Sequence, residues 1–185
     1  MSHKNWLILW LACSSSALAS APSLDPGAAT CTVWQRELSF ARSVQQHDTA
    51  AFAGHLMADA VFDANTPRPT RGRAAIVQHW TPMLAGTSVQ LHWYPQQVVV
   101  SDDDRLAYSS GPYLFENAAP GAKQRYTIGR FATTWRRAAD GVWRAAFDAG
   151  DNGRPASAAD VAAFRAGRMA SCPGKTVAEL PVIRH

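Results

Sequence analysis

Hydrophobic positions in the first half of the chain recur at helical spacing. Between residues 32 and 46 the apolar side chains fall mostly on one face, which is typical of an amphipathic helix. Asp48 opens a second, short helix, and Ala60-Val61-Phe62 follows as a short strand. A third helix starts near Gly72, and we expect Pro82 in its last turn to bend or end it.

In the second half the period changes from 3.6 residues to two, which indicates strands. The third and fourth strands flank Asp140-Gly141, a two-residue hairpin signal. Ser157 and Asp160 then resemble a capping box that opens a final helix from Ala158 to Met169. Helices followed by antiparallel strands predict an α+β fold. The alternating segments are 89–100, 106–115, 125–137 and 142–149.

Residues 1–19 have the composition of an export signal. His3 and Lys4 precede the apolar run 6–11, and Ala17-Leu18-Ala19 matches the pattern that signal peptidase cleaves. We therefore expect cleavage after Ala19 and a periplasmic or secreted protein. Cys13 leaves a second interpretation open, in which it is the acylated first residue of a lipoprotein.

Composition excludes some classes of protein. Hydrophobic residues make up 47% and charged residues 17% of the 185 residues, which is enough apolar surface for a buried core. The formal charge is +4, but the arginines are scattered, whereas nucleic-acid surfaces usually cluster their charge. No apolar run approaches the roughly 20 residues of a transmembrane helix. We expect neither a nucleic-acid partner nor a membrane span.

Two cysteines remain after cleavage, Cys31 and Cys172. In an oxidising compartment such a pair normally forms a disulfide. Two free buried thiols are the alternative. Two cysteines alone make a poor metal site, and no CxxC or HxxxH spacing is present. We expect no metal and no cofactor.

These observations divide the chain into four parts. The signal occupies residues 1–19, and a flexible linker rich in Pro, Ala and Ser occupies 20–30. One domain covers residues 31–152. The C-terminal helix and tail cover residues 153–185.

The order of elements resembles the NTF2-like fold, which ketosteroid isomerases and scytalone dehydratases share with the SnoaL and DUF4440 groups. This resemblance implies a cone in which N-terminal helices pack in a curved antiparallel sheet, here with an extra C-terminal helix. It also implies a pocket that is apolar apart from a few polar groups. The details are most similar to DUF4440, over about residues 32–150. The segments that carry the resemblance are ELSFA (37–41), HDTAAF (47–52), DAVF (59–62), RGRAAI (71–76), LHWYP (91–95), LAYSSGPY (106–113), GRFATTW (129–135) and DGVW (140–143).

The resemblance implies which side chains bind a ligand in the pocket. Tyr108 and Tyr113 lie on opposite faces of one strand, and we favour Tyr108 for the pocket. Trp93 and Trp143 are assigned to the core. Glu37 has a second interpretation, as a helix acid bonded to neighbouring backbone or an arginine. The expected pocket residues are Glu37, Phe40, Phe62, Trp80, Tyr108, Phe131, Thr133, Trp135 and Asp148.

The resemblance allows the positions of the catalytic residues of ketosteroid isomerase to be compared with this sequence. That enzyme uses an aspartate base and an oxyanion hole made of a tyrosine and a protonated aspartate. The corresponding positions here hold Ala64, Phe40 and Gly129, which can neither move nor share a proton. That mechanism is therefore not expected, although Asp63 lies one residue from the position of the base.

Asp148 is the best catalytic candidate. It has the same strand parity as Ala146, which the resemblance places toward the pocket. A carboxyl group in an apolar pocket has a raised pKa, which favours proton transfer. The alternative is a carboxylate paired with Arg130 or Arg144.

Three functions stay open. The first is an exported pocket protein that binds a small, largely apolar molecule, with its chemistry unassigned. The second is a lyase-type or isomerase-type enzyme that uses Asp148 as general acid or base. The third is a dimeric interaction module. A homodimer would form through the outer sheet face, where strand alternation puts Tyr126, Ile128 and Ala132.

Overall fold

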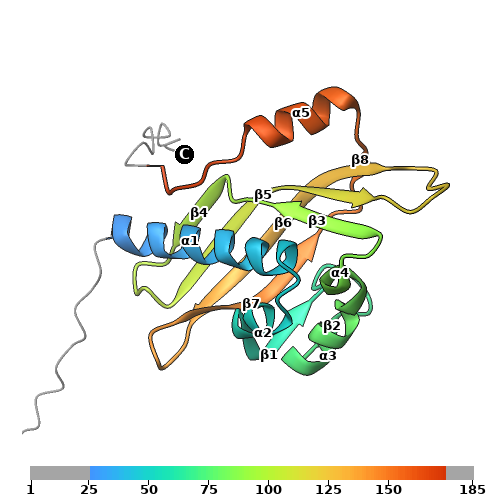
Figure 1. The fold of residues 1–185 in the computed structure, drawn as a ribbon. Helices are drawn as coiled ribbons and strands as arrows, with labels where there is room; N and C mark the ends of the chain where they lie inside the picture. Colours follow the sequence, from blue (N-terminus) through green and yellow to red (C-terminus); the bar gives the residue numbers. More distant parts are fainter. Residues whose placement is uncertain (1–25, 174–185) are drawn as a thin grey trace, which may run out of the picture.

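Helix α1 (Pro26–Gln45) lies across one face of a curved sheet in the computed structural model, which describes residues 26–173 (Figure 1). It begins within the stretch predicted as a flexible linker. Proline is well suited to the first turn of a helix, because its missing N–H group costs no hydrogen bond there. The buried residues Val33, Phe40 and Val44 belong to the main core. The predicted export signal lies outside the described residues.

Four further helices follow within the described residues. Helix α2 (Thr49–Gly54) is capped by Asp48, whose carboxylate accepts the N–H of Ala51 at 2.9 Å. The third predicted helix is two helices, α3 (Arg73–His79) and α4 (Thr81–Ala85). They separate because Pro82, in the first turn of α4, cannot donate a hydrogen bond back to α3. Helix α5 (Ala158–Ala166) has the predicted capping box but ends before Met169.

Eight strands form one sheet in the described part of the chain. Their main order is β2-β1-β7-β6-β5-β3, while β4 pairs with β5 and β8 with β6. The strands are antiparallel except β1 and β7, which are parallel. The prediction of an antiparallel sheet fails at this pair because no hairpin joins the two strands to fix their direction. The bounds are β1 Leu56–Phe62, β2 Thr70–Arg71, β3 Val89–Trp93, β4 Gln97–Val100, β5 Leu106–Asn117, β6 Tyr126–Arg137, β7 Trp143–Gly150 and β8 Arg154–Pro155.

The segment predicted as one strand over residues 89–100 is broken into β3 and β4. Pro95 lies in the break, and proline has no N–H group for the strand ladder. The chain comes so close to β5 here that a Cβ atom on Gly111 would lie 2.1 Å from the carbonyl oxygen of Tyr94. Pairing resumes when the N–H of Gln96 donates to the carbonyl oxygen of Ser110 at 2.8 Å.

A register shift in β7 decides which of its side chains face inward. Thr134 pairs with Phe147, whereas the next residue of β6 pairs with Ala145, so the ladder skips one residue of β7. Ala145 and Ala146 are consequently both buried, whereas Phe147 is 50% exposed. Because one extra residue reverses the alternation of a strand, the shift places Asp148 on the inner face.

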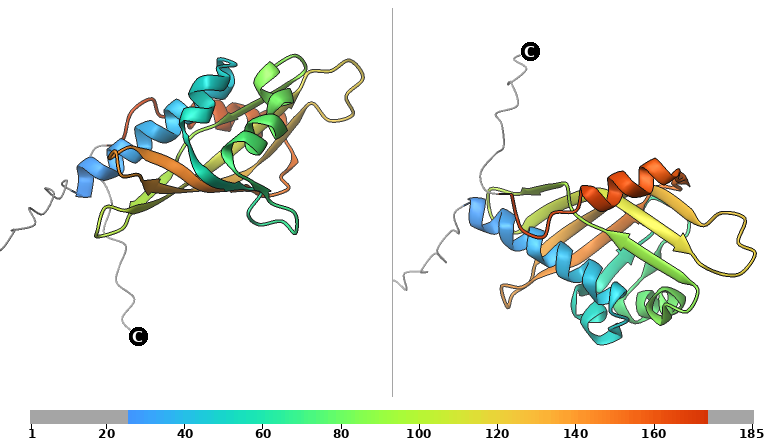
Figure 2. Two further views of the ribbon diagram at one scale, coloured as in Figure 1. Left: turned by 90° about the horizontal axis from the view of Figure 1, so that it is seen from below. Right: turned by 45° about the horizontal axis from the view of Figure 1, so that its top comes forward.

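Helix α5 closes a second apolar cluster, separate from the main core. Val161 and Phe164 of α5 pack with Trp34 and Leu38 of α1, and with Tyr94 and Leu114. Figures 1 and 2 show α5 and the α3–α4 pair on opposite sides of the molecule.

The predicted disulfide is present and links the start of α1 to the segment after α5. Cys31 and Cys172 are bonded, with their Cα atoms 5.3 Å apart. The alternative of two free thiols is therefore wrong. No helix within residues 26–173 is both long and apolar enough to cross a bilayer.

Candidate functional site

A cavity of about 270 Å³ lies where β1 and β7 end. Its volume is close to the lower end of the ~300–1,000 Å³ that is typical of ligand pockets, so it suits a small molecule. The apolar lining consists of Phe40, Leu91, Trp80, Trp93, Tyr113 and Phe131. The polar lining consists of Asp63, Thr66, Asp148, Gly150, Asp151 and Asn152.

Asp148 brings a carboxyl group to the inner wall of this cavity. Its Oδ2 accepts the hydroxyl proton of Thr133, the residue directly opposite on β6, at 2.7 Å. Desolvation, together with the nearby carboxyl groups of Glu37 and Asp63, raises the pKa of Asp148 to about 7, although the Thr133 hydrogen bond opposes this effect. The predicted alternative of a pair with Arg130 or Arg144 does not occur. Arg144 pairs instead with Asp140, and Arg130 binds the Gln96 side chain.

Glu37 of α1 is fully buried behind the cavity wall. Its carboxylate accepts hydrogen bonds from Trp93 Nε1 at 2.6 Å, from Trp135 Nε1 at 3.1 Å and from the Ser109 hydroxyl. Burial raises the pKa of Glu37, although these donors and Thr133 oppose that effect. The interpretation of Glu37 as a helix acid bonded to backbone or an arginine is therefore wrong.

Asp63 supplies a second carboxyl group at the mouth of the cavity. It follows β1 in the left-handed backbone conformation, with φ of 55°. Its Oδ2 lies 3.9 Å from Nε2 of His79. The carboxylate close to the isomerase base position is therefore Asp63, and Ala64 is exposed.

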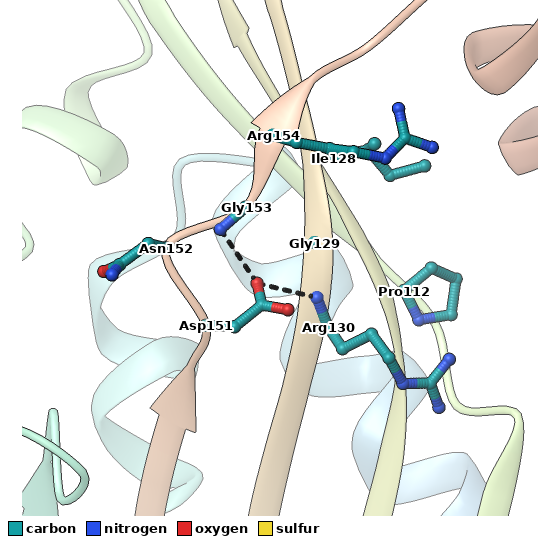
Figure 3. Close-up of a pocket in the computed structure, with 8 residues that line it drawn as sticks. All are labelled: Pro112, Ile128, Gly129, Arg130, Asp151, Asn152, Gly153 and Arg154. Carbon is teal, nitrogen blue, oxygen red and sulfur yellow. Dashed lines mark hydrogen bonds between the residues drawn. The ribbon is translucent and has the colours of Figure 1, made fainter.

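The segment after β7 forms the rim of the cavity and is held by backbone hydrogen bonds. Asp151 Oδ1 accepts the N–H groups of Arg130 and Gly153 (Figure 3). The Tyr113 hydroxyl donates to the carbonyl oxygen of Asp151 at 2.9 Å. A Cβ atom on Gly129 would lie 2.1 Å from Asp151 Oδ1 and 2.5 Å from the Tyr113 ring, so glycine is required for this arrangement.

A second hollow of about 510 Å³ lies on the other side of this rim, and Figure 3 shows its lining. The guanidinium groups of Arg130 and Arg154 extend over it toward the same side. Both are already engaged, since Arg130 donates to Gln96 and Arg154 forms two hydrogen bonds with Asp160. We therefore place the candidate site in the aromatic cavity. No group of three or more His, Cys, Asp or Glu residues within residues 26–173 could hold a metal ion.

The predicted pocket residues divide into three groups. Phe40, Trp80, Phe131 and Asp148 line the cavity. Glu37, Phe62, Thr133 and Trp135 are buried behind these residues, where they support the lining through hydrogen bonds or ring contacts. Tyr108 alone forms the third group, outside the cavity.

The prediction for the two tyrosines is wrong. Tyr113 lines the cavity, whereas Tyr108 lies on the outer face and is 44% exposed. The outer apolar surface also differs from the predicted stripe, because Tyr126 and Ile128 pack partly against the α5 cluster. Tyr108 pairs with Val99 of β4, another exposed apolar residue.

Sequence reasoning missed several lining residues. Trp93 belongs to the main core, as expected, but its ring also borders the cavity while its N–H group binds Glu37. Asp63, the acid one residue from the isomerase base position, carried a usable signal. Asp151 and Asn152 carried none, because they follow the last long strand and have only turn-like composition.

The fold has many relatives among solved structures. An NTF2-like superfamily protein from Salmonella enterica is 14% identical and matches with a TM-score of 0.56, covering 71% of this chain and 94% of that protein. A ketosteroid isomerase-like protein from Erwinia carotovora is 15% identical, with a TM-score of 0.51 and coverage of 65% and 93%. An NTF2-like protein with a cystatin-like fold from Novosphingobium aromaticivorans is 19% identical, with a TM-score of 0.53 and coverage of 71% and 85%. At these identities the likeness shows the fold alone. No curated protein matches the chain.

The family model for the SnoaL-like domain matches residues 38–172. The resemblance in the sequence covers about residues 32–150. The matched range extends further and includes α5 and Cys172. It also covers most of the described chain and all strands of the sheet. The chain therefore belongs to the SnoaL-like domain family and has the NTF2-like fold.

Proposed function

We propose that this protein binds one small molecule with a largely apolar body in the cavity between α1 and the end of the sheet. The observation that carries the proposal is the lining, in which five aromatic rings surround the carboxyl group of Asp148. Apolar walls with few polar groups are the usual composition of a ligand pocket, because the walls supply affinity and the polar groups fix orientation.

A screen of small apolar compounds tests this proposal, with tryptophan fluorescence as the readout because Trp80 and Trp93 line the cavity. A Leu91→Trp variant should fill the cavity and abolish binding. The matched control is Val99→Trp, since Val99 is 53% exposed on β4, and it should bind as the wild type does. Equal binding by the two variants would place the ligand elsewhere.

A second candidate function is proton transfer by Asp148, as in a lyase-type or isomerase-type enzyme. The observation that favours it is a carboxyl group facing the cavity with a pKa raised to about 7, since general acids and bases work best near the ambient pH. Thr133 holds the orientation of this carboxyl group.

Hydrogen exchange offers a test that needs no known substrate. Carbonyl compounds that bind are incubated in D₂O, and deuterium incorporation next to the carbonyl group is followed by NMR. The wild type should catalyse the exchange, and Asp148→Asn should bind equally well without catalysing it. Equal exchange by the two proteins would remove Asp148 from this role.

Export to the periplasm or the cell exterior is part of the proposal. Its support is the Cys31–Cys172 disulfide, because such bonds persist in oxidising compartments. Mass spectrometry of the exported protein should find Ser20 as the first residue after cleavage at Ala19. An acylated Cys13 as the first residue would instead establish a lipoprotein.

Self-association through the outer sheet face is a further proposal. Val99, Tyr108 and Phe147 are exposed, and they are linked across neighbouring strands through Thr134. An apolar row of this kind on an exposed sheet face favours contact with a second copy.

A further inference from the structure

We propose that the ligand of this cavity is an organic cation, an ammonium group carried on an apolar body. This inference rests on the proposed function, because it names the chemical class of the molecule that would occupy the same cavity. Three independent features of the cavity point to a positive charge: the sign of its lining, the incomplete partners of its carboxyl groups and the arrangement of its rings.

The charge of the lining is opposite to that of the whole chain. The sequence has 18 Lys and Arg residues against 14 Asp and Glu residues. The cavity nevertheless has three aspartates and no lysine, arginine or histidine among its lining residues. His79 lies outside the lining, with its Nε2 atom 3.9 Å from Oδ2 of Asp63. An anionic ligand would meet repulsion here, and a cation would meet attraction.

The carboxyl groups next to the cavity lack a cationic partner. Among residues 26–173, no lysine, arginine or histidine forms an ion pair with Glu37 or Asp148. Asp148 Oδ2 is bonded to Thr133, and no described residue donates a hydrogen bond to Oδ1. Carboxyl groups removed from water are destabilised in their charged form unless a counter-charge is close. A bound ammonium group would supply that charge and a donor for Oδ1.

The aromatic rings of the lining contact one another edge to face, at steep angles. The Phe40 and Trp93 rings meet at 80°, Trp93 and Trp80 at 72°, and Trp93 and Phe131 at 64°. The faces of aromatic rings carry negative charge density and attract cations, most strongly where water is excluded. Proteins use clusters of aromatic rings to recognise alkylammonium groups.

Asp63 and Asp148 are the acids that carry the proposal. The Asp151 carboxylate is already engaged by the N–H groups of Arg130 and Gly153, so it contributes only at longer range. Asp63 has a half-exposed side chain at the cavity mouth, where it would attract a cation during entry. Asp148 lies deeper and would contact the bound ammonium group.

The test compares pairs of probes that differ mainly in charge. The first pair is 1-adamantylammonium and 1-adamantanol, and the second is 2-phenylethylammonium and 2-phenylethanol. Affinities are measured by tryptophan fluorescence and calorimetry at about pH 8, where both amines are protonated. We expect each amine to bind about tenfold more tightly than its alcohol.

Two variants locate the source of this preference. Asp63→Asn and Asp148→Asn should each lower the affinity for the amine about threefold to tenfold and leave the affinity for the alcohol unchanged. Asp102→Asn is the matched control, because Asp102 lies in the exposed loop between β4 and β5 and the change in net charge is the same. It should leave both affinities unchanged.

The possible results separate the inference from the proposed function. If the alcohols bind as tightly as the amines, or if both cavity variants keep the full preference, the inference is wrong while a small-molecule pocket remains. If none of the four probes binds, the proposed function fails together with the inference.

Discussion

The carboxyl groups of Glu37 and Asp148 both interact with Thr133, and they differ in the number of their hydrogen-bond donors. Glu37 is hydrogen-bonded by Trp93, Ser109 and Trp135, whereas Asp148 is bonded by Thr133 alone. Donors stabilise a carboxylate, so hydrogen bonds oppose the effect of burial at Glu37 through more partners than at Asp148. Asp148 is the group of this pair that faces the cavity.

The pKa of Asp148 predicts a dependence of stability on pH. Its folded value of about 7 lies above the ~3.9 of an unfolded aspartate. Between these values the folded state binds a proton that the unfolded state releases, so rising pH lowers the free energy of unfolding. Asp148→Asn should remove this loss. Relative to the wild type it should gain stability from pH ~4 to ~7, by at most about 4 kcal/mol.

Urea unfolding of both proteins across this pH range measures the difference. Burial lowers the pKa of His55 to about 4 and gives the opposite slope, but this contribution is common to both proteins and cancels. A difference that does not change with pH would show that Asp148 titrates normally.

At the level of elements, irregularities in the strands shape the cavity. The break between β3 and β4 follows Trp93, and the shift in β7 precedes Asp148. Without the break the strand would continue straight along β5, and without the shift Phe147 would face inward. These two interruptions therefore place the indole and the carboxyl group that define the site.

Gly111→Ala tests the break directly. The new Cβ atom would lie 2.1 Å from the Tyr94 carbonyl oxygen, so the segment before β4 must move. We expect a loss of about 2–4 kcal/mol in the free energy of unfolding, measured by urea unfolding. The control is Gly54→Ala, where nothing lies within 4 Å and stability should stay equal or rise slightly. A Gly111 variant as stable as this control would contradict the close approach.

At the scale of the whole molecule, the disulfide ties α5 to the domain. Reduction of Cys31–Cys172 should lower the melting temperature, with a loss of a few kcal/mol below the ceiling of about 5 for a loop of 141 residues. Val161 and Phe164 still pack against α1, so α5 should loosen without unfolding the cavity. Thermal melts and ligand binding with and without reductant measure both effects. Complete alkylation of both cysteines without reductant would contradict the bond.

The exposed row on the outer face predicts a dimer. Sedimentation at high micromolar concentration should find two copies in the wild type and one copy after Tyr108→Asp with Phe147→Asp, because charge on an apolar contact costs desolvation. Met169→Asp is the control, since Met169 is also exposed but lies after α5. A wild-type monomer would exclude this interface.

Local patterns in the sequence determined most of the helices and the long strands, and their order along the chain. The caps at Asp48 and Ser157, the interruption at Pro82 and the cysteine pair are short-range or chemical signals, so they were readable without a structure. The same holds for the aromatic character of the pocket, because the abundance of Trp and Phe at strand and helix positions is a property of composition.

The tertiary structure alone decided which face of β5 lines the cavity. Alternation divides a strand into two faces but does not say which face is inside. The sequence therefore favoured Tyr108 for the cavity, whereas Tyr113 lines it. A shift of one residue in pairing reverses the faces, and such a shift occurs where β7 pairs with β6. The hydrogen bonds from Trp93 and Trp135 to Glu37 likewise form only where β3, β6 and α1 meet. No local pattern in the sequence relates residues so far apart.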